Sequence, residues 1–315
     1  MRGIRIPSAE GRHARSALWG FRGRRVILAG TGLLVVAVAG AVGVGELLSA
    51  PARARVGAAP ADWGAVDVAL TTTDGRRVFG WFVATESPRG TVLLLHGVRA
   101  DRRQIAGRVP FLRARGYSTM LIDLPSHGES DGDRITSGAH EAAAVEAAIR
   151  DLHRRAPGLP VGVIGSSMGA AAVVLAHLPD ALDAVVLESM YPTIEEATDD
   201  RMRNALGPLG PWPSPLLLAQ LPLRAGVSPH DLHPIEAIRS LSSPILIMNG
   251  SEDRHTTPQE ASRIFAAVNS PKQLWIVPGA GHVDLHAYAT TEYEARVGRF
   301  FAAYLDQAAR HGGTK

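Results

Sequence analysis

Short apolar runs alternate with amphipathic stretches along this chain from about residue 61 onward. The apolar runs are rich in Val, Ile and Leu, as buried strands are, whereas the stretches between them repeat their apolar positions with helical spacing. This alternation predicts an α/β fold with a mostly parallel, eight-stranded sheet that helices cover on both faces. Strands are predicted at 65–72, 76–84, 91–95, 117–123, 161–164, 184–187, 244–248 and 273–277, and helices at 101–115, 140–154, 170–176, 258–268 and 288–309.

Two stretches depart from this alternation. The first two strands are joined at Asp74-Gly75, a dipeptide typical of tight turns, so we expect an antiparallel hairpin at the sheet edge. Residues 192–235 carry eight prolines and are dense in Leu, Met and Trp. Because they follow one strand and precede the next, we expect a small helical cap over the carboxyl edge of the sheet. Trp212 and the leucines would wall an apolar pocket, and a long surface loop is the alternative.

The N-terminal part has a different pattern. Residues 26–44 are apolar without a charge, and the run extends past one glutamate to residue 48. This is about the length that crosses a bilayer as a helix, so residues 26–48 are predicted to be a transmembrane anchor. Five glycines within the run make a buried helix of a soluble protein less favourable, because glycine destabilises helices in water. Residues 49–60 are rich in Ala, Pro and Arg and are predicted to be a linker to a folded domain at 61–315.

The distribution of charge predicts how this segment is oriented across a membrane. Residues 1–25 hold seven arginines against one glutamate, a net charge of +6, whereas the whole chain carries +3, so the remainder carries −3. The positive-inside rule then predicts a basic cytoplasmic arm and an extracytoplasmic domain. The sequence Ala52-Arg53-Ala54 leaves a cleaved signal peptide and a secreted protein as the alternative. Arg24-Arg25 faintly resembles a twin-arginine export signal.

The same charge distribution argues against a nucleic-acid partner, because the basic excess adjoins the apolar segment and does not form a surface of the folded part. The chain has no cysteine. This excludes disulfides, thiolate nucleophiles and cysteine-ligated metals.

A Gly-x-Ser-x-Gly pattern lies between the apolar run 161–164 and the Ala-rich stretch 170–176. A strand, a sharp turn and a helix in this order are the elements of a nucleophile elbow, with Ser167 at its tip. Gly165 and Gly169 flank the turn because side chains there would collide with the neighbouring strand and helix. A chance match in a glycine-rich chain is the alternative, and the flanking elements argue against it.

A serine hydroxyl needs a base to take its proton and a carboxylate to orient that base. The strand at 244–248 leads to Asp253, and the strand at 273–277 leads to His282. Serine, aspartate and histidine in this chain order, each just past a strand, is the order of the α/β-hydrolase triad. A parallel sheet brings such loops to one edge, so the sequence predicts Ser167, His282 and Asp253 as nucleophile, base and acid.

Attack on a carbonyl creates an oxyanion, which needs positioned donors. We expect one donor to be the backbone N–H of Met168, directly after the nucleophile. The second is expected in the loop after the strand at 91–95, where His96-Gly97-Val98 stands, and the N–H of Val98 is our choice. His96 is predicted to hold this loop by hydrogen bonds.

Other polar side chains compete for these roles. Glu188, at the end of the strand at 184–187, is a rival for the triad acid, or else supports the cap or His282 from behind. Three short sets of acids and histidines invite comparison with metal sites, but none supplies a complete ligand set, so neither a metal nor a cofactor is expected. The sets are His282, Asp284 and His286; His230, Asp231 and His233; and Asp253 with His255.

Five motifs together resemble the serine hydrolases of the α/β-hydrolase superfamily, over nearly all of residues 61–310. They are Leu94-Leu95-His96-Gly97, Asp123-Leu124-Pro125-Ser126-His127-Gly128-Glu129-Ser130, Gly165-Ser166-Ser167-Met168-Gly169, Asn249-Gly250-Ser251-Glu252-Asp253 and Gly281-His282. The resemblance is to the branch with serine aminopeptidase-like, monoglyceride-lipase-like and membrane-anchored Bem46/ABHD-type enzymes. It implies that Asp123 and His127 belong to a structural loop.

The expected activity is hydrolysis of a carboxylic ester, from a lipid or a small acyl group, through an acyl-enzyme on Ser167. Amide or peptide hydrolysis uses the same machinery and stays open. An aminopeptidase needs an acid for a free amine, and the predicted cap offers Glu195, Glu196, Asp199 and Asp200. A catalytically silent, membrane-tethered binding protein is the third alternative, against which an intact triad argues.

Overall fold

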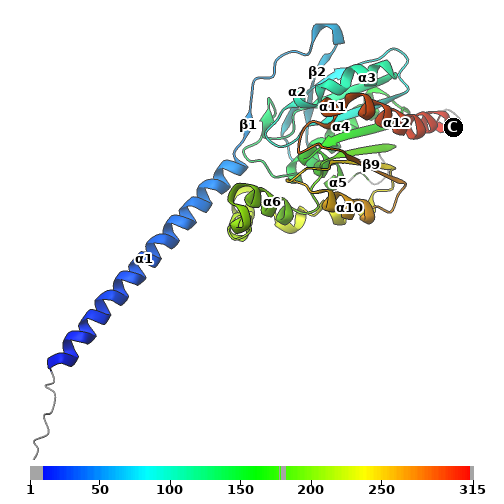
Figure 1. Ribbon diagram of the computed structural model, residues 1–315. Coiled ribbons are helices and arrows are strands. Elements are labelled where there is room, and N and C mark those ends of the chain that lie inside the picture. Colours follow the sequence, from blue (N-terminus) through cyan, green and yellow to red (C-terminus); the bar gives the residue numbers. More distant parts are fainter. Residues whose placement is uncertain (1–9, 177, 179–181, 313–315) are drawn as a thin grey trace, which may run out of the picture. The chain divides into compact units, whose positions relative to one another are not determined.

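The computed structural model describes residues 10–176, 178 and 182–312, and the chain divides into two compact units, Met1–Leu47 and Leu48–Lys315. The described part of the first unit is helical and belongs to α1, Glu10–Ser49, whose last two residues lie in the second unit; this helix is blue in Figure 1. The helix therefore begins inside the predicted basic arm, of which residues 1–9 lie outside the described residues.

One helix of the described chain is long and apolar enough to cross a membrane, by length and composition alone. It is the part of α1 at Leu28–Ser49, which has a mean hydropathy of 2.0 and coincides with the predicted apolar segment. Apolar side chains along it are exposed, among them Leu28 at 69% and Val36 at 68%. Exposed apolar side chains in this number are unfavourable in water and favourable in lipid.

The second unit is built on the predicted eight-stranded sheet, in the order β10-β9-β8-β7-β4-β5-β3-β2 (Figure 1). Its strands are β2 Val66–Thr71, β3 Arg77–Val83, β4 Gly90–Leu95, β5 Tyr117–Ile122, β7 Val161–Ser166, β8 Ala184–Glu188, β9 Ile245–Gly250 and β10 Lys272–Val277. β2 pairs with β3 and β3 with β5 in antiparallel fashion, whereas the other neighbours are parallel. The mostly parallel sheet with an edge hairpin is thus confirmed. The central strands read as unbroken apolar runs because both of their faces are buried.

Helices cover both faces of the sheet, as predicted. One core layer packs α4 Ala139–Arg155, α5 Met168–Leu175 and α10 Pro258–Ala267 against the sheet. The other layer packs α3 Val109–Ala114, α11 Leu285–Tyr288 and α12 Thr290–Gly312 against the opposite face. Alternate residues of each strand feed the two layers, since successive side chains of a strand point to opposite faces.

The prediction of one continuous helix at 101–115 is wrong. The structure breaks it into α2 Arg102–Ile105, a 3-10 turn at Ala106–Arg108, and α3. Pro110 has no N–H to continue the α-helical ladder, so the chain restarts its helix there. The break turns the side chain of Arg108 into the protein, where it is 1% exposed.

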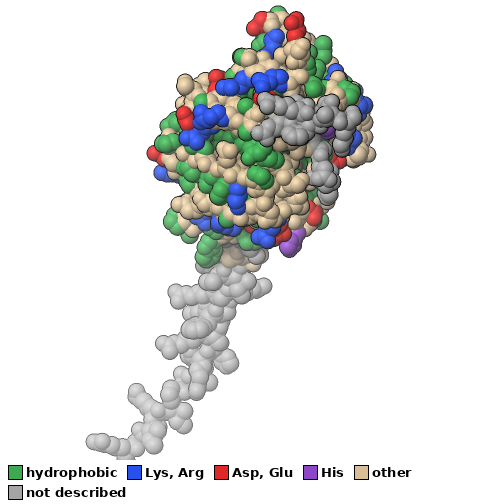
Figure 2. Space-filling model, turned by 90° about the vertical axis from the view of Figure 1, so that its right-hand side faces the viewer, with side chains coloured by type: hydrophobic (Ala, Val, Ile, Leu, Met, Phe, Trp, Pro, Cys, Tyr) green, Lys and Arg blue, Asp and Glu red, His purple; other side chains and the backbone are tan. Residues whose placement is uncertain are grey.

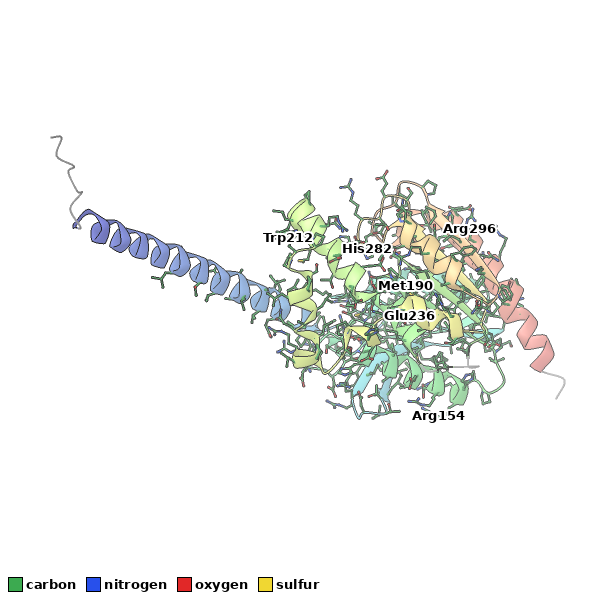
Figure 3. The ribbon with its side chains drawn as sticks, turned by 90° about the horizontal axis from the view of Figure 1, so that it is seen from below. Arg154, Met190, Trp212, Glu236, His282 and Arg296 are labelled. Atoms are coloured by element: carbon green, nitrogen blue, oxygen red, sulfur yellow. The ribbon has the colours of Figure 1, made fainter. Side chains whose placement is uncertain are left out.

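The predicted cap is helical. Between β8 and β9 the chain forms α6 Ile194–Leu206, α7 Ser214–Leu218, α8 Leu221–Ala225 and α9 Pro234–Ala237. The prediction that Trp212 walls a pocket is wrong, because its side chain is 83% exposed, and Figure 3 draws it at the outer edge of the domain.

On the face drawn in Figure 2, basic side chains are scattered among acidic and apolar ones.

The stretch 49–60, which is predicted to be a linker, contains a short strand. Strand β1, Ala52–Arg53, pairs in parallel with β6, His127–Gly128, so the chain is part of the second unit from Leu48 onward. Backbone pairing of this kind depends on a partner in a distant loop and leaves no pattern in the segment's own composition.

Candidate active site

Ser167 lies at the sharp turn between β7 and α5. Its backbone has φ 49° and ψ −110°, a conformation that is costly for any residue with a Cβ. A Cβ on Gly165 would lie 2.8 Å from the backbone N of Ala170, and one on Gly169 would lie 2.6 Å from the carbonyl oxygen of His96. Only glycine allows strand and helix to approach so closely at both positions. The local geometry is that of a nucleophile elbow.

Asp253 and His282 are brought together by the loops after β9 and β10. His282 Nδ1 lies 2.8 Å from Asp253 Oδ2, and the Asp253 side chain is fully buried. Asp253 Oδ1 accepts from the backbone N–H groups of His255 and Thr256 at 2.8 and 3.0 Å. Burial raises the pKa of Asp253, but the hydrogen bonds from His282, Thr256 and His255 outweigh it and leave the pKa below its usual value. The carboxylate therefore stays charged and fixes the imidazole.

Gly250, the last residue of β9, makes this approach possible. A Cβ at this position would lie 2.2 Å from the carbonyl oxygen of Ala280. The backbone N–H of Glu252 donates to the same oxygen at 2.8 Å, which joins the two loops. Sequence analysis included Gly250 in a motif but gave it no role.

The loop after β4 lies against Ser167, since a Cβ on Gly97 would be 3.6 Å from Ser167 Cβ. The N–H of Gly97 donates to Gln104 Oε1 at 2.8 Å. The N–H of Val98 has no hydrogen-bond partner among the residues that the structure describes. Met168 is the first residue of α5, where the helix offers its N–H no carbonyl partner. Neither of the two predicted donors therefore has a hydrogen-bond acceptor among the described residues.

Two buried histidines hold this loop. His96 Nε2 accepts from the N–H of Leu124 at 3.0 Å, and its Nδ1 lies 2.7 Å from the carbonyl oxygen of Gly97. His127 Nε2 accepts from the N–H of Arg99 at 2.9 Å. An accepting Nε2 requires the proton on Nδ1, so both rings are neutral. Burial, with a contribution from His127, lowers the pKa of His96 to about 3, and burial lowers the pKa of His127.

Glu188 is engaged away from His282. Its carboxylate is 2.6 Å from Arg108 Nη2 and also accepts from the hydroxyl of Tyr293. Arg108 Nη2 also binds Asp284 at 2.8 Å, two residues after His282. Burial lowers the pKa of Arg108, but Glu188, Tyr293 and Asp284 outweigh it and raise the pKa well above its usual value. Arg108 therefore links the end of β8 to the His282 loop, and sequence analysis missed it.

The residues of the three metal-like sets have other partners. His286 Nε2 lies 3.0 Å from Glu294, and His233 Nε2 lies 3.0 Å from Glu195. Within the described ranges, no group of three or more such side chains is arranged to hold a metal ion.

Comparison with known proteins places this geometry in a family. The model of the alpha/beta hydrolase family matches residues 92–296, more than half of the chain. The uncharacterized protein Rv2307c of Mycobacterium tuberculosis (strain ATCC 25618 / H37Rv) is 31% identical over 223 residues, which cover 69% of this chain and 72% of that protein. The alpha/beta hydrolase domain-containing protein WAV2 of Arabidopsis thaliana is 25% identical over 236 residues, with coverage of 69% and 72%.

Solved structures agree in fold. The Pyrococcus furiosus esterase Pf2001 superimposes with a TM-score of 0.69 at 24% identity, covering 82% of this chain and 98% of the esterase. The esterase RhEst1 from Rhodococcus sp. ECU1013 superimposes with a TM-score of 0.59 at 18% identity, with coverage of 76% and 99%. This chain belongs to the alpha/beta hydrolase family.

Proposed function

We propose that this protein is a serine hydrolase that cleaves carboxylic esters, of a lipid or a small acyl group, through an acyl-enzyme on Ser167. The observation that carries the proposal is the 2.8 Å hydrogen bond between His282 and buried Asp253, formed by loops at the sheet edge where Ser167 also stands. A charged, buried aspartate that orients a histidine is what a serine nucleophile needs.

The reaction follows from these groups. Ser167 Oγ attacks the ester carbonyl carbon while its proton passes to His282 Nε2, and the N–H groups of Val98 and Met168 stabilise the oxyanion. Collapse breaks the bond to the alcohol, which leaves with the proton from His282. Water then loses a proton to His282 and attacks the acyl carbon of the acyl-enzyme. Collapse breaks the bond to Ser167 Oγ, which takes the proton back from His282, and the acid leaves.

Asp253 is our choice for the triad acid over Glu188. Asp253 contacts His282 directly, whereas Glu188 is paired with Arg108 and Tyr293. We assign Glu188 and Arg108 to holding the loop of His282, and His96 to holding the loop of Val98.

An ester is favoured over an amide by the acidic residues of α6. Three of the four candidates for binding a free amine have cationic or histidine partners: Glu195 with His233, Glu196 with Arg263, and Asp200 with Arg203. The esterase names of solved structures with this fold give further support. Amide hydrolysis remains the second candidate, and a silent binding protein the third.

We also propose that α1 anchors the enzyme in the membrane with its hydrolase domain outside the cytoplasm, in the manner of the membrane-anchored branch named above. The 22-residue apolar stretch and the arginines before it support this orientation. Cleavage of a signal peptide is the competing proposal. Immunoblotting of a C-terminally tagged chain separates them, since an anchored protein keeps its full length and stays with membranes after alkaline extraction.

The enzymatic proposal is tested on the full chain in detergent micelles with p-nitrophenyl esters and aminoacyl p-nitroanilides. Ser167→Ala is expected to abolish ester hydrolysis, whereas Ser166→Ala, the matched change one residue earlier, is expected to keep it within a few fold. Equal activity of Ser167→Ala and the native chain would overturn the nucleophile. Faster turnover of the anilides would move the enzyme to the amidases.

A further inference from the structure

The stretch between the apolar helix and the hydrolase domain, residues 49–57, is bonded to the domain along its length, and we call it the strap. The carbonyl oxygen of Ser49 accepts from the N–H of Ile135 at 2.8 Å. Ala52 donates to the carbonyl oxygen of Ser126 at 2.8 Å, and Ala54 donates to that of Gly128 at 2.9 Å. Hydrogen bonds at this regular spacing hold a strand and not a free tether.

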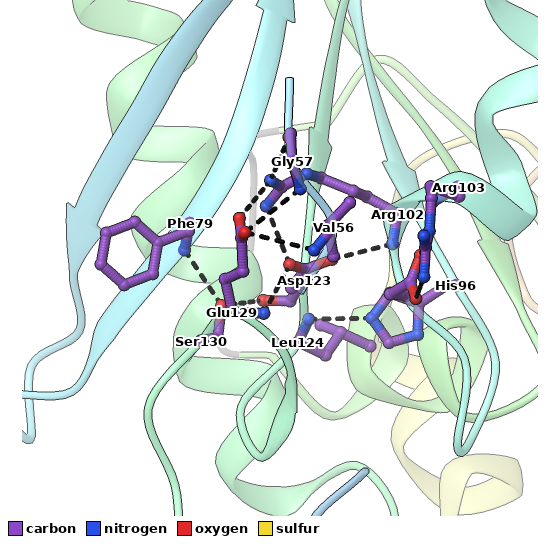
Figure 4. A network of polar contacts seen from close by, with 11 residues as sticks. Val56, Gly57, Phe79, His96, Arg102, Arg103, Asp123, Leu124, Glu129 and Ser130 are labelled. Carbon is purple, nitrogen blue, oxygen red and sulfur yellow. Dashed lines mark hydrogen bonds and ion pairs between the residues drawn. The ribbon is translucent and has the colours of Figure 1, made fainter. Parts of the chain in front are cut away.

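The far end of the strap is held by one carboxylate. Glu129 Oε1 accepts from the N–H groups of both Val56 and Gly57 at 3.2 Å (Figure 4). Glu129 Oε2 lies 2.6 Å from Arg102 Nη2, whose side chain is 2% exposed. Burial raises the pKa of Glu129, but the hydrogen bonds from Gly57 and Arg102 outweigh it and keep the pKa below its usual value. The charged Glu129 thus joins the strap to Arg102.

Arg102 connects Glu129 to the loop that bears Val98. Asp123 is fully buried and accepts from both the side chain and the backbone N–H of Arg102 at 2.8 Å (Figure 4). Arg102 begins α2, three residues after Arg99. The position at which the chain leaves the Val98 loop is therefore set by Glu129 and Asp123 together.

A second route runs through β6. Ala52 is the register partner of His127, and His127 Nε2 accepts from the N–H of Arg99. Arg99 has φ 59°, a left-handed conformation that a non-glycine residue keeps only when its surroundings hold it. Arg99 directly follows Val98, so the strap lies one paired strand and one hydrogen bond away from the proposed oxyanion donor.

We propose that the strap positions the oxyanion loop, so that this hydrolase reaches full activity only with its N-terminal segment attached through residues 49–57. This rests on the proposed function, in which Val98 is an oxyanion donor. A cut after Ala54 would detach Ala52 and Ala54 from their partners and leave Glu129 without the anchored end of the strap. The proposal therefore predicts that the working enzyme is the uncleaved, tethered chain.

Proline substitution in the full chain tests the strap. Ala54→Pro removes the N–H that donates to Gly128, and Ala59→Pro is the same change in the same linker beyond the bonded stretch. Positioning of the oxyanion loop predicts a fall in kcat of about 10- to 100-fold for Ala54→Pro with KM within about twofold, because misplaced donors weaken mainly the transition state. Ala59→Pro should stay within about twofold in both constants.

A second variant guards against misfolding. Glu129→Gln keeps the size of the side chain and removes the charge that binds Arg102. Its kcat should fall in parallel with its affinity for a trifluoromethyl ketone, which adds Ser167 Oγ to form a hemiketal whose oxyanion faces the same donors, while the fluorescence of the folded protein is unchanged. If Ala54→Pro loses both its activity and its folded fluorescence, the kcat of Glu129→Gln alone decides whether the strap has this role.

The outcomes separate the two proposals. Native kcat in both Ala54→Pro and Glu129→Gln, with an active native chain, would overturn the role of the strap and leave the serine hydrolase intact. A native chain without hydrolase activity would overturn the proposed function instead. In that case, hydrogen exchange at residues 98–103 still tests the strap, which predicts faster exchange in Ala54→Pro than in Ala59→Pro.

Discussion

Removing the buried guanidinium of Arg108 breaks the ion pairs that join the end of β8 to the loop of His282. Arg108→Met keeps most of the apolar stem and deletes the charge that Glu188 and Asp284 share. The Glu188 side chain is 2% exposed and would remain as a buried carboxylate with Tyr293 as its remaining hydrogen-bond donor among the residues described above. Asp284, at 27%, can be reached by water.

The size of the effect follows from burial. Breaking a buried ion pair by removing one partner costs about 3–5 kcal/mol, because the other charge is left uncompensated. Exposed pairs contribute about 0–1 kcal/mol. Arg103, in the neighbouring helix α2, pairs with Asp101 and is 53% exposed, so Arg103→Met is the matched control. The double variant Arg108→Met with Glu188→Gln should recover part of the loss, since no buried charge is then left alone.

Urea unfolding of the full chain in detergent micelles, followed by tryptophan fluorescence, measures these changes. We expect Arg108→Met to lower the free energy of unfolding by about 3–5 kcal/mol and Arg103→Met by less than about 1 kcal/mol. A loss in Arg108→Met no larger than in the control would show that the buried ion pair does not stabilise the fold. So would a double variant less stable than Arg108→Met.

Three further predictions concern the elbow, the acid and the pH. Gly169→Ala should lower ester turnover by about 100-fold, because its Cβ would lie 2.6 Å from a backbone oxygen. Steady-state kinetics measures this change, and native turnover would contradict it. Asp253→Asn should lower kcat by about 10⁴-fold and Glu188→Gln by less than tenfold, and the reverse order would make Glu188 the acid. Burial and the neighbouring Asp200 raise the pKa of Glu260 to about 7, against about 4.5 when unfolded. The native state thus keeps a proton that the unfolded state releases, so the stability of the native chain relative to Glu260→Gln should fall as the pH rises from 5 to 8; an equal pH dependence of the two urea midpoints would contradict this.

Sequence alone predicts the sheet well because its strands are apolar runs with turn residues between them. The hairpin at Asp74-Gly75 and the elbow at Ser167 are local patterns, in which backbone and chemistry depend on neighbouring residues. The pairing of Asp253 with His282 can also be predicted from the sequence, because a parallel sheet brings the ends of its strands to one edge.

The remaining features depend on contacts between distant residues. Arg108 meets Glu188 across 80 positions and Asp284 across 176, and nothing in the local pattern around 108 marks it as buried. Glu129 meets Val56 across 73 positions, so the strap resembles an ordinary linker when its composition alone is considered. Trp212 was placed in a pocket by its apolar character, which does not decide whether a side chain is buried.

An activated nucleophile at Ser167 would react with a fluorophosphonate, so covalent labelling identifies it. The full chain in detergent micelles is incubated with a fluorophosphonate probe, and the labelled peptide is identified by mass spectrometry. We expect one labelled residue, Ser167, with labelling lost in Ser167→Ala, slowed in Asp253→Asn and retained in Ser166→Ala. Undiminished labelling of Ser167→Ala, or a label on another residue of the native chain, would contradict it.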